Sequence, residues 1–554
     1  MDITFDYETK HLEHCSPKFS NLFVGCMAGD SKSIRQTGSF ENSPEDLTIA
    51  HNAKFDMKCR MKDNPSIELG QVYDTQIAFK VLREDLPKEA YKLESLAGIF
   101  YDYPNYKKLV DFKDKKENYY DTPDKMETLK LYNRHDLYAT QKLREISEPA
   151  LKRQGMWSLF LMLMDFTKEL AYSEMHGIKV DQEELTKQEV LLKEKIDSIE
   201  EYFITIADIN WNSPAQVVEY FLSCGFKLYK PRGKKNYSVD EKALERLSNE
   251  SKVAEELLEY RHLQKAHKTY VVGFRNRLYD WTYYPDYNQL GTKTGRLSEK
   301  FIQLMPRKET STFKRFIVSK FDGGLLLEAD WSQLEVALNA ELTQDPQLLK
   351  DVKEGITLPN GEHFDIHNYT RHMLPFLPDR TRAKNVIFNF FYGGHNWTLV
   401  NLYGLTDDQA TKFLDYANKR YPRVKETHIK KKYLVDTKGY IITEPTGRRR
   451  YTSKYTQAYN TDIQGLGSDF NKIMFIEVSK ILRDNLLRSH IVAEIHDSLV
   501  IDIHPEETDE VIGLVKYAYD HFNDYWTIYF DYKLKLDYKA EFKIGVNLYD
   551  TTKI

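Results

Sequence analysis

Two acids close to the N-terminus form the first pair that could hold a metal ion. Asp6 and Glu8 lie two positions apart in MDITFDYET, a segment in which apolar and polar residues alternate. The alternation predicts a β-strand that turns both carboxylates to one face, where they can chelate a divalent cation. The spacing alone is weak evidence, because a chain with 84 acids contains such pairs by chance, as at Asp181 and Glu183.

Two later motifs supply further acids. Asn52, Phe55 and Asp56 lie in IAHNAKFDMKCR, and Tyr132 and Asp136 lie in LYNRHDLYAT. In the second motif a spacing of four puts the tyrosine hydroxyl and the carboxylate on one helical face. An aspartate within an apolar helical stripe is costly to bury unless it is paired or binds a metal. This cost favours a site at Asp136.

These acids together predict a two-metal site that hydrolyses phosphodiesters, with ions about 3.5–4 Å apart that activate water and stabilise the leaving oxygen. The carboxylates that would hold the ions are Asp6, Glu8, Asp56 and Asp136. Tyr132 would orient the attacking water. The alternative for each motif alone is a helix cap or a surface acid, and the succession of the motifs along the chain argues against it.

A second acidic pair lies far downstream. GLLLEADWSQLEVALNAEL predicts a buried strand that ends at Asp330 and a helix that begins near Gln333. IVAEIHDSLVIDI predicts a hairpin with Asp497 near its tip. Turn chemistry alone also explains an aspartate at such a tip. Two aspartates at strand ends could instead share two Mg²⁺ ions and support phosphoryl transfer.

A helical stripe lies between these aspartates. In DRTRAKNVIFNFFYGG, Arg380, Lys384, Phe388 and Tyr392 are each four residues apart, so they follow one face that begins cationic and ends aromatic. Such a face can clamp a triphosphate and pack against the attached base. The alternative is an amphipathic helix with core aromatics and a solvated basic end. The chain has no GxxxxGK[ST] motif, which argues against a P-loop.

The elements that must position these residues fall into several domains. The 554 residues allow three or four domains. Residues 1 to about 150 read as α/β, Trp157 to about His267 as mostly long helices, and the remainder as mixed.

No apolar run of membrane-spanning length and no secretory leader is visible, and four scattered cysteines favour a reducing compartment. The net charge is 79 − 84 = −5, so nucleic-acid binding would need local basic surfaces such as residues 380–384, 430–432 and 448–450.

Taken together, these motifs resemble those of the family-A DNA polymerases, the group of the bacterial repair polymerase and several bacteriophage replicases. The first three motifs look like those of its 3′–5′ proofreading exonuclease. Residues 330–335, 380–393 and 496–498 look like the three polymerase motifs. The resemblance covers essentially the whole chain. It implies an α/β and α+β multidomain fold, with an RNase H-like exonuclease domain at 1–150 and a right-hand polymerase domain at 151–554. The polymerase domain would have its thumb at about 165–288, its palm at about 289–345 and 455–554, and its fingers at about 346–454.

The resemblance also implies residue roles. Asp330 and Asp497 would hold the catalytic metals of synthesis, Glu335 would block a ribose 2′-hydroxyl, and Phe388 would lie against the nucleotide's sugar and base. The residues expected to contact the incoming nucleotide are Arg380, Lys384, Phe388, Tyr392, His367, Glu335 and Gln333. The residues expected to contact DNA are Arg296, Gln303, Asn460, Gln464 and His496.

We therefore expect a DNA-templated DNA polymerase with 3′–5′ proofreading that uses two Mg²⁺ per active site, with Mn²⁺ as a substitute. Its partners would be primer–template DNA, dNTPs and a replisome protein or processivity factor that the sequence does not identify, with no membrane. The two-domain design looks more typical of bacteriophage than of cellular replication, so the location would be the cytoplasm, that of the host for a phage protein. Asp6 of the first nuclease motif lies almost at the N-terminus, and the ending KIGVNLYD resembles the C-terminus of the family, so we expect a complete chain without a preceding 5′-nuclease domain.

Two other functions remain alternatives. A single-subunit RNA polymerase relative shares the metal chemistry, but Glu335 and the nuclease motifs argue against it. A stand-alone exonuclease whose C-terminal part only binds DNA is the other alternative. Asp330, Asp497 and the cations at 380 and 384 argue against that function.

Overall fold

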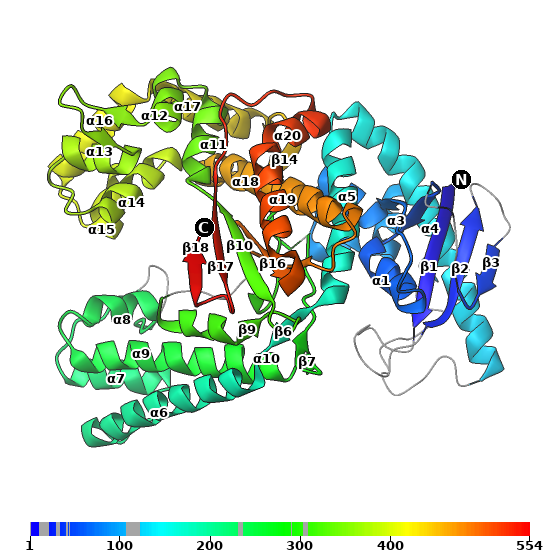
Figure 1. The fold of residues 1–554 in the computed structure, drawn as a ribbon. Coiled ribbons are helices and arrows are strands. Elements are labelled where there is room, and N and C mark those ends of the chain that lie inside the picture. Colours follow the sequence, from blue (N-terminus) through cyan, green and yellow to red (C-terminus); the bar gives the residue numbers. More distant parts are fainter. Residues whose placement is uncertain are drawn as a thin grey trace.

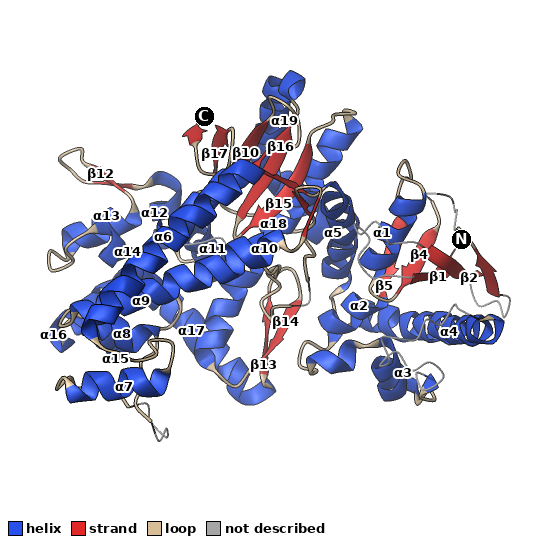
Figure 2. Cartoon of the chain, turned by 90° about the horizontal axis from the view of Figure 1, so that it is seen from below, coloured by secondary structure: helices blue, strands red, loops and turns tan. Residues whose placement is uncertain are grey.

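The computed structural model describes residues 2–9, 21–28, 34–39, 43, 45–106, 122–230, 236–289, 291–302 and 308–554. In both views the N-terminal domain lies at one end of the molecule and the helices α12 to α17 lie at the other (Figures 1 and 2). A five-stranded antiparallel sheet, the central sheet, lies between them. Within the described residues, none of the helices combines the length and the apolar character needed to cross a membrane.

The N-terminal domain is built on a mixed sheet of order β3-β2-β1-β4-β5, in which β1 is antiparallel to β2 and parallel to β4. Its strands are β1 Asp2–Thr9, β2 Asn21–Ala28, β3 Ile34–Thr37, β4 Leu47–Ala50 and β5 Gln71–Asp74. Its helices are α1 Ala53–Asp63, α2 Thr75–Leu82, η1 Lys88–Tyr91, α3 Leu93–Tyr101 and α4 Pro123–Arg153. Helix α4 packs against β1, so the acid-bearing strand and the acid-bearing helix lie in contact.

Helix α5, Trp157–His176, joins this domain to the rest of the chain and packs against α1, α18 and β15. A helical arm follows, made of α6 Gln182–Ile206, α7 Pro214–Ser223, α8 Glu241–Leu247 and α9 Lys252–Ala266. A π-helical stretch, His267–Val272, and α10, Gly273–Arg275, complete it. A small sheet of order β7-β8-β6-β9 lies at its base, formed by β6 Ile178–Val180, β7 Leu278–Tyr279, β8 Thr282–Tyr283 and β9 Ile317–Val318, with the 3-10 helix η5 Lys308–Phe316 before β9.

The central sheet has the order β15-β16-β10-β17-β18. Its strands are β10 Leu325–Trp331, β15 His490–Ile495, β16 Ser498–Ile503, β17 Ala540–Gly545 and β18 Thr551–Lys553. The associated helices are α11 Leu334–Thr343, α18 Tyr455–Asp484, η6 Pro505–Glu507, α19 Thr508–Asp520 and α20 Phe522–Phe530. Trp331, Phe470 and Phe522 pack edge-on or tilted with ring centroids 4.4–6.2 Å apart, so an aromatic core joins β10 to α18 and α20.

The remaining region is helical and begins with α12, Pro346–Glu354. Its other helices are α13 Ile366–Met373, α14 Arg380–Phe391, α15 Asn396–Tyr403, α16 Asp407–Arg420 and α17 Pro422–Lys438. Two short hairpins accompany them, β11 Ile356–Thr357 with β12 His363–Phe364, and β13 Tyr440–Thr443 with β14 Arg448–Tyr451. Contacts of α17 and β13 with α18 hold this region against the central sheet.

The local expectations agree with these elements. A strand spans Asp2–Thr9, a helix carries positions 132 and 136, and long helices fill most of 157–267. Asp497 lies in the two-residue turn between β15 and β16, and α11 begins one residue after Gln333. Helix α14 ends at Phe391, so the last member of the expected stripe, Tyr392, is the C-cap residue.

Candidate active sites

The central sheet brings Asp330 and Asp497 together. Asp330 in β10 is paired with Ser498 in β16, the residue that follows Asp497. The hairpin turn is tight because His496 adopts the left-handed conformation, with φ of 59°. Burial raises the pKa of Asp330 to about 6, and the charges of Glu328 and Asp497 add to this effect. An acid pair with this mutual repulsion is suited to a divalent cation.

Arg296 is a cation that contacts Asp497 of this pair. Its Nη2 donates to both carboxylate oxygens of Asp497, at 2.9 and 3.0 Å. The residue before it, Gly295, is fixed by α18, because its carbonyl accepts hydrogen bonds from Lys472 Nζ at 2.8 Å and Ser468 Oγ at 2.9 Å. Gly295 has φ of +88°, and a Cβ there would lie 2.7 Å from a guanidinium nitrogen of Arg448, so this position requires glycine.

A chain of side chains leads from Arg296 to α14. Arg296 Nη2 lies 3.9 Å from Glu335 Oε1 in the first turn of α11. The same Glu335 oxygen accepts a bond from Gln464 Nε2 at 2.7 Å, and that nitrogen lies 3.2 Å from Tyr392 Oη. Burial and the charge of Glu335 raise the pKa of Tyr392, so its hydroxyl stays protonated. The contacts thus bring residues from four separate segments of the chain to one place.

The predicted stripe on α14 is present. Arg380 is exposed at the helix start and donates to Asp365 Oδ2 from Nε at 2.9 Å and Nη2 at 2.7 Å. Lys384 Nζ lies 5.5 Å from the Phe388 ring centroid, and the Phe388 and Tyr392 rings are 6.3 Å apart and nearly parallel at 21°. This face therefore runs from cationic to aromatic, as expected of a surface that binds a phosphate and a base.

His367 lies against this face, 5.8 Å from the Phe388 ring. It is 2% exposed, and burial lowers its pKa to about 4, so the imidazole is neutral near pH 7. Gln333, Asn460 and His496 are exposed at the surface. Gln303, the remaining expected DNA contact, lies outside the described residues.

The buried charges beneath the site were not anticipated from the sequence. Lys472 and Asp469 lie inside α18, and Asp469 also pairs with Arg448. Burial lowers the pKa of Lys472 to about 8 and raises that of Glu494 to about 7. The available signal was a set of charged residues within apolar runs, DFNKIMF and IVAEI, because charges in such positions need partners.

A second acidic cluster lies in the N-terminal domain. Asp6 and Glu8 on β1 and Asp136 on α4 each have an oxygen within 4.8 Å of the others. Asp56 on α1 adjoins them. Its Oδ1 accepts the Tyr7 N–H at 3.0 Å, and burial together with the charge of Asp6 raises its pKa well above the usual value. Hard oxygen donors in this number fit Mg²⁺ or Mn²⁺.

Tyr106 and Asn133 are neighbours of this cluster that sequence reasoning missed. Tyr106 Oη donates to Asp136 Oδ1 at 2.5 Å, and Asn133 Nδ2 donates to Asp6 Oδ2 at 2.8 Å. The ring of Tyr132 packs 5.8 Å from that of Tyr106 in a buried aromatic group. The water-orienting role of Tyr132 stays a prediction.

Three cations of the basic runs 430–432 and 448–450 form ion pairs with buried acids. Lys431 pairs with Asp462 at 2.5 Å, Arg450 pairs with Glu84 at 2.5 Å, and Arg448 pairs with Asp469. All three acids are buried. These three cations therefore serve internal ion pairs, and contact of the runs 430–432 and 448–450 with nucleic acid stays a prediction.

Comparison with known proteins gives a consistent set of similarities. Residues 182–550 match the family model described as DNA polymerase family A. The chain is 29% identical over 510 residues to DNA polymerase I of Borreliella burgdorferi, covering 86% of this chain and 53% of that protein. It is 29% identical over 518 residues to DNA polymerase I of Synechocystis sp., covering 84% and 50%. The chain thus spans about half the length of these curated relatives.

A solved structure has a similar fold. The POL domain of Pol1 from M. smegmatis, in complex with DNA primer-template and dNTP, aligns with a TM-score of 0.80 at 20% sequence identity. The alignment covers 99% of this chain and 96% of that one. At this level of identity the likeness establishes the fold.

Proposed function

The chain belongs to DNA polymerase family A, and we propose that it is a DNA-templated DNA polymerase that adds dNTPs to a primer 3′-hydroxyl by two-metal phosphoryl transfer. One observation carries the proposal: contacts run without interruption from Asp497 through Arg296, Glu335 and Gln464 to Tyr392. They connect Asp497, which lies beside Asp330 in the central sheet, to the aromatic end of α14.

Asp330 and Asp497 are the residues that would hold Mg²⁺, for which Mn²⁺ can substitute. When bound, such ions favour the ionised primer hydroxyl and neutralise charge on the phosphates. Arg380 and Lys384 would bind the triphosphate, and Arg380 would exchange its bond to Asp365 for phosphate. Neutral His367 would donate one hydrogen bond to the same group.

The remaining residues would position the nucleotide and the DNA. Phe388 would pack on the sugar and base, and Tyr392 would line the insertion site. Glu335, held by Gln464, would occupy the space of a ribose 2′-hydroxyl. Arg296 and Gln464 would reach minor-groove acceptors, which are shared by all base pairs and therefore suit a templated enzyme. The roles of Gln333, Gln303, Asn460 and His496 at nucleotide or DNA are part of the same proposal.

We further propose that the N-terminal domain is a 3′–5′ proofreading exonuclease. The support is the approach of Asp6, Glu8 and Asp136 to within 4.8 Å, with Asp56 beside them. These carboxylates would hold the metals, and Tyr132 would orient the water that attacks the terminal phosphodiester.

The proposed division is an exonuclease domain at 1–150 and a polymerase domain at 151–554. A thumb would correspond to the helical arm and fingers to α12 to α17. A role in DNA replication, in the cytoplasm of a cell or of a phage host, follows from this proposal.

An end-labelled primer on a longer DNA template tests both activities. With Mg²⁺ and dNTPs the primer should lengthen, without dNTPs its 3′ end should shorten, and rNTPs should not substitute. Asp497→Ala should abolish extension alone. Asp6→Ala with Glu8→Ala should abolish shortening alone, because the two sites use different carboxylates. Extension by Asp497→Ala would refute the synthesis site, equal use of rNTPs would favour an RNA polymerase, and shortening without extension would leave an exonuclease only.

A further inference from the structure

Helix α1 has two functional faces. Asp56, on one face, adjoins the N-terminal acidic cluster. Lys54 and Lys58 are one turn apart, and each is two residues from Asp56, which places them on the opposite side of the helix. Both lysines are buried, an unusual position for this residue type, and both point away from the N-terminal sheet. The opposite face of α1 must therefore meet a specific partner.

That partner is Glu174 of α5, which has no solvent-exposed surface. Its Oε1 accepts from Lys54 Nζ at 2.5 Å and its Oε2 from Lys58 Nζ at 2.7 Å. Oε1 also accepts the backbone N–H of Tyr287 at 2.8 Å. Burial alone would lower the pKa of Lys58, but the charges of Glu174 and Asp286 raise it above its ordinary value, so the lysine stays charged. One carboxylate thus binds two cations of α1 and one amide from another segment.

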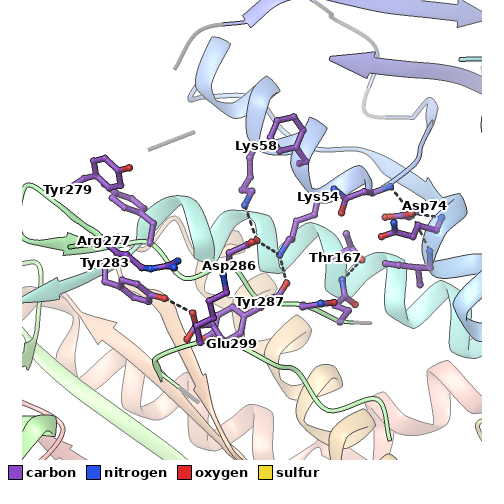
Figure 3. Close-up of a pocket in the computed structure, with 18 of the residues that line it drawn as sticks. Lys54, Lys58, Asp74, Thr167, Arg277, Tyr279, Tyr283, Asp286, Tyr287 and Glu299 are labelled. Carbon is purple, nitrogen blue, oxygen red and sulfur yellow. Dashed lines mark hydrogen bonds and ion pairs between the residues drawn. The ribbon is translucent and has the colours of Figure 1, made fainter. Parts of the chain in front are cut away.

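The amide belongs to a residue anchored to the central sheet. Tyr287 is 1% exposed, its Oη accepts the Glu494 N–H at 3.1 Å and donates to the Glu494 carbonyl at 3.5 Å. Glu494 is in β15, three residues before Asp497. Lys54 Nζ also donates to the Tyr287 carbonyl, so α1 is bound to this anchor directly as well as through Glu174. Figure 3 shows Lys54, Lys58, Asp286 and Tyr287 converging at the edge of a cavity of about 980 Å³ between α1 and residues 273–300.

We propose that Glu174 is a positioning residue of the exonuclease site: from outside the N-terminal domain it holds α1, and with it Asp56, in the place that metal binding requires. This inference rests on the proposed exonuclease function. Apolar side chains would give α5 and α1 a comparable contact, but they would leave the helix free to shift along its axis. Three directed bonds fix that position, and carboxylates that orient metal ligands through intermediates have effects of about 10–100-fold.

The chain offers a matched control. Asp286 Oδ1 lies 3.3 Å from Lys54 Nζ and 3.7 Å from Lys58 Nζ, so it faces the same two lysines as Glu174. Its side chain is 83% exposed, however, and water can replace it. Asp286→Asn removes one charge from the same cluster without leaving a buried cation unpaired.

The experiment compares Glu174→Gln, Asp286→Asn and the wild-type chain. Hydrolysis of a 3′-labelled single strand is measured across Mg²⁺ concentrations, together with primer extension and Tm. Glu174→Gln should lower kcat for hydrolysis about 10–100-fold and raise the Mg²⁺ concentration for half-maximal activity, with KM for the strand and the extension rate within about twofold of wild type. Asp286→Asn should stay within about twofold in every measurement.

A second variant separates positioning from stability. Glu174→Gln leaves both Lys54 and Lys58 without their buried carboxylate, which lowers Tm, whereas adding Lys58→Met removes the more deeply buried of the two cations. Lys54 keeps its bonds to Asp286 and to the Tyr287 carbonyl. The double variant should regain much of the lost Tm and still hydrolyse slowly. Recovery of hydrolysis along with Tm, or wild-type hydrolysis in Glu174→Gln itself, would overturn the inference while leaving the proposed function intact. A wild-type chain that extends primers but never shortens them would overturn the exonuclease proposal and this inference with it.

Discussion

Replacing Asp330 by asparagine should stabilise the metal-free fold while abolishing synthesis. Burial, Glu328 and Asp497 raise the pKa of Asp330 from 3.8 to about 6. Each unit of difference between the folded and unfolded pKa corresponds to about 1.4 kcal/mol, so the ionised carboxylate lowers the free energy of unfolding by about 3 kcal/mol above pH 6. Asparagine has nearly the same shape and no charge, so Asp330→Asn should recover most of that amount. The apparent Tm at pH 8 in EDTA should rise by a few degrees.

The pH dependence has a definite sign. A raised folded-state pKa means that the native protein takes up the proton first, so wild type regains the lost stability as pH falls from 6 towards 3.8. The advantage of Asp330→Asn in EDTA should therefore shrink over that range. Added Mg²⁺ should raise the Tm of wild type more than that of the variant, because the carboxylate that binds the ion is gone.

Asp497→Asn is the matched comparison. It should abolish synthesis equally, but it loses a charge from the bidentate pair with Arg296, whose two bonds are 2.9 and 3.0 Å long. Charge-assisted bonds of this kind are worth about 1.5–3 kcal/mol, so its Tm in EDTA should not rise. Thermal melts of the three proteins between pH 4.5 and 8 decide the question. An Asp330→Asn protein no more stable than wild type at pH 8, or equally stabilised at pH 4.5, would refute the electrostatic account of this site.

Two further expectations concern the nucleotide face. Phe388→Tyr should raise the ddNTP/dNTP incorporation ratio about tenfold, because a hydroxyl near the sugar could replace the contact of a missing 3′-hydroxyl, and one hydrogen bond is worth about 1.4 kcal/mol. Single-nucleotide extension measures this ratio. An unchanged ratio would contradict the placement of the Phe388 ring against the sugar. The pKa of His367 is about 4 in the folded protein and 6.5 when unperturbed, so the free energy of unfolding of wild type should fall by up to about 3 kcal/mol between pH 6.5 and pH 4. In a pH series of thermal melts, the Tm of His367→Gln should fall less steeply than that of wild type. Parallel profiles would mean that this histidine titrates normally.

The sequence predicts much of each acidic site because strand and helix periods determine which residues share a face. The alternation in MDITFDYET places Asp6 and Glu8 together, and the apolar runs around Asp497 form the expected hairpin. What periodicity cannot provide is the register between distant strands. The pairing of Asp330 with Ser498 depends on the packing of the whole central sheet, and only the structure places Asp497 beside Asp330.

Buried partners are the other part that sequence reasoning misses. Glu174 lies in an unremarkable helical segment, AYSEMHG, and its contacts come from residues 116 to 120 positions earlier and 113 positions later. No local pattern encodes such distances. The one clue is energetic, because a glutamate and two lysines at apolar positions require partners whose identity the fold alone decides.

The distribution of paired cations also changes how a chain of net charge −5 would bind DNA. Counting Lys and Arg runs points to 430–432 and 448–450, but Lys431, Arg448 and Arg450 neutralise buried acids. On α14 the situation differs: within the described part of the chain Lys384 pairs with no acid, and Arg380 pairs with Asp365 at an exposed site where exchange for phosphate costs little. Under the proposed function, affinity for a triphosphate would therefore depend on two cations at one helix start, positioned by local spacing, and charge density along the sequence would be a poor guide to it.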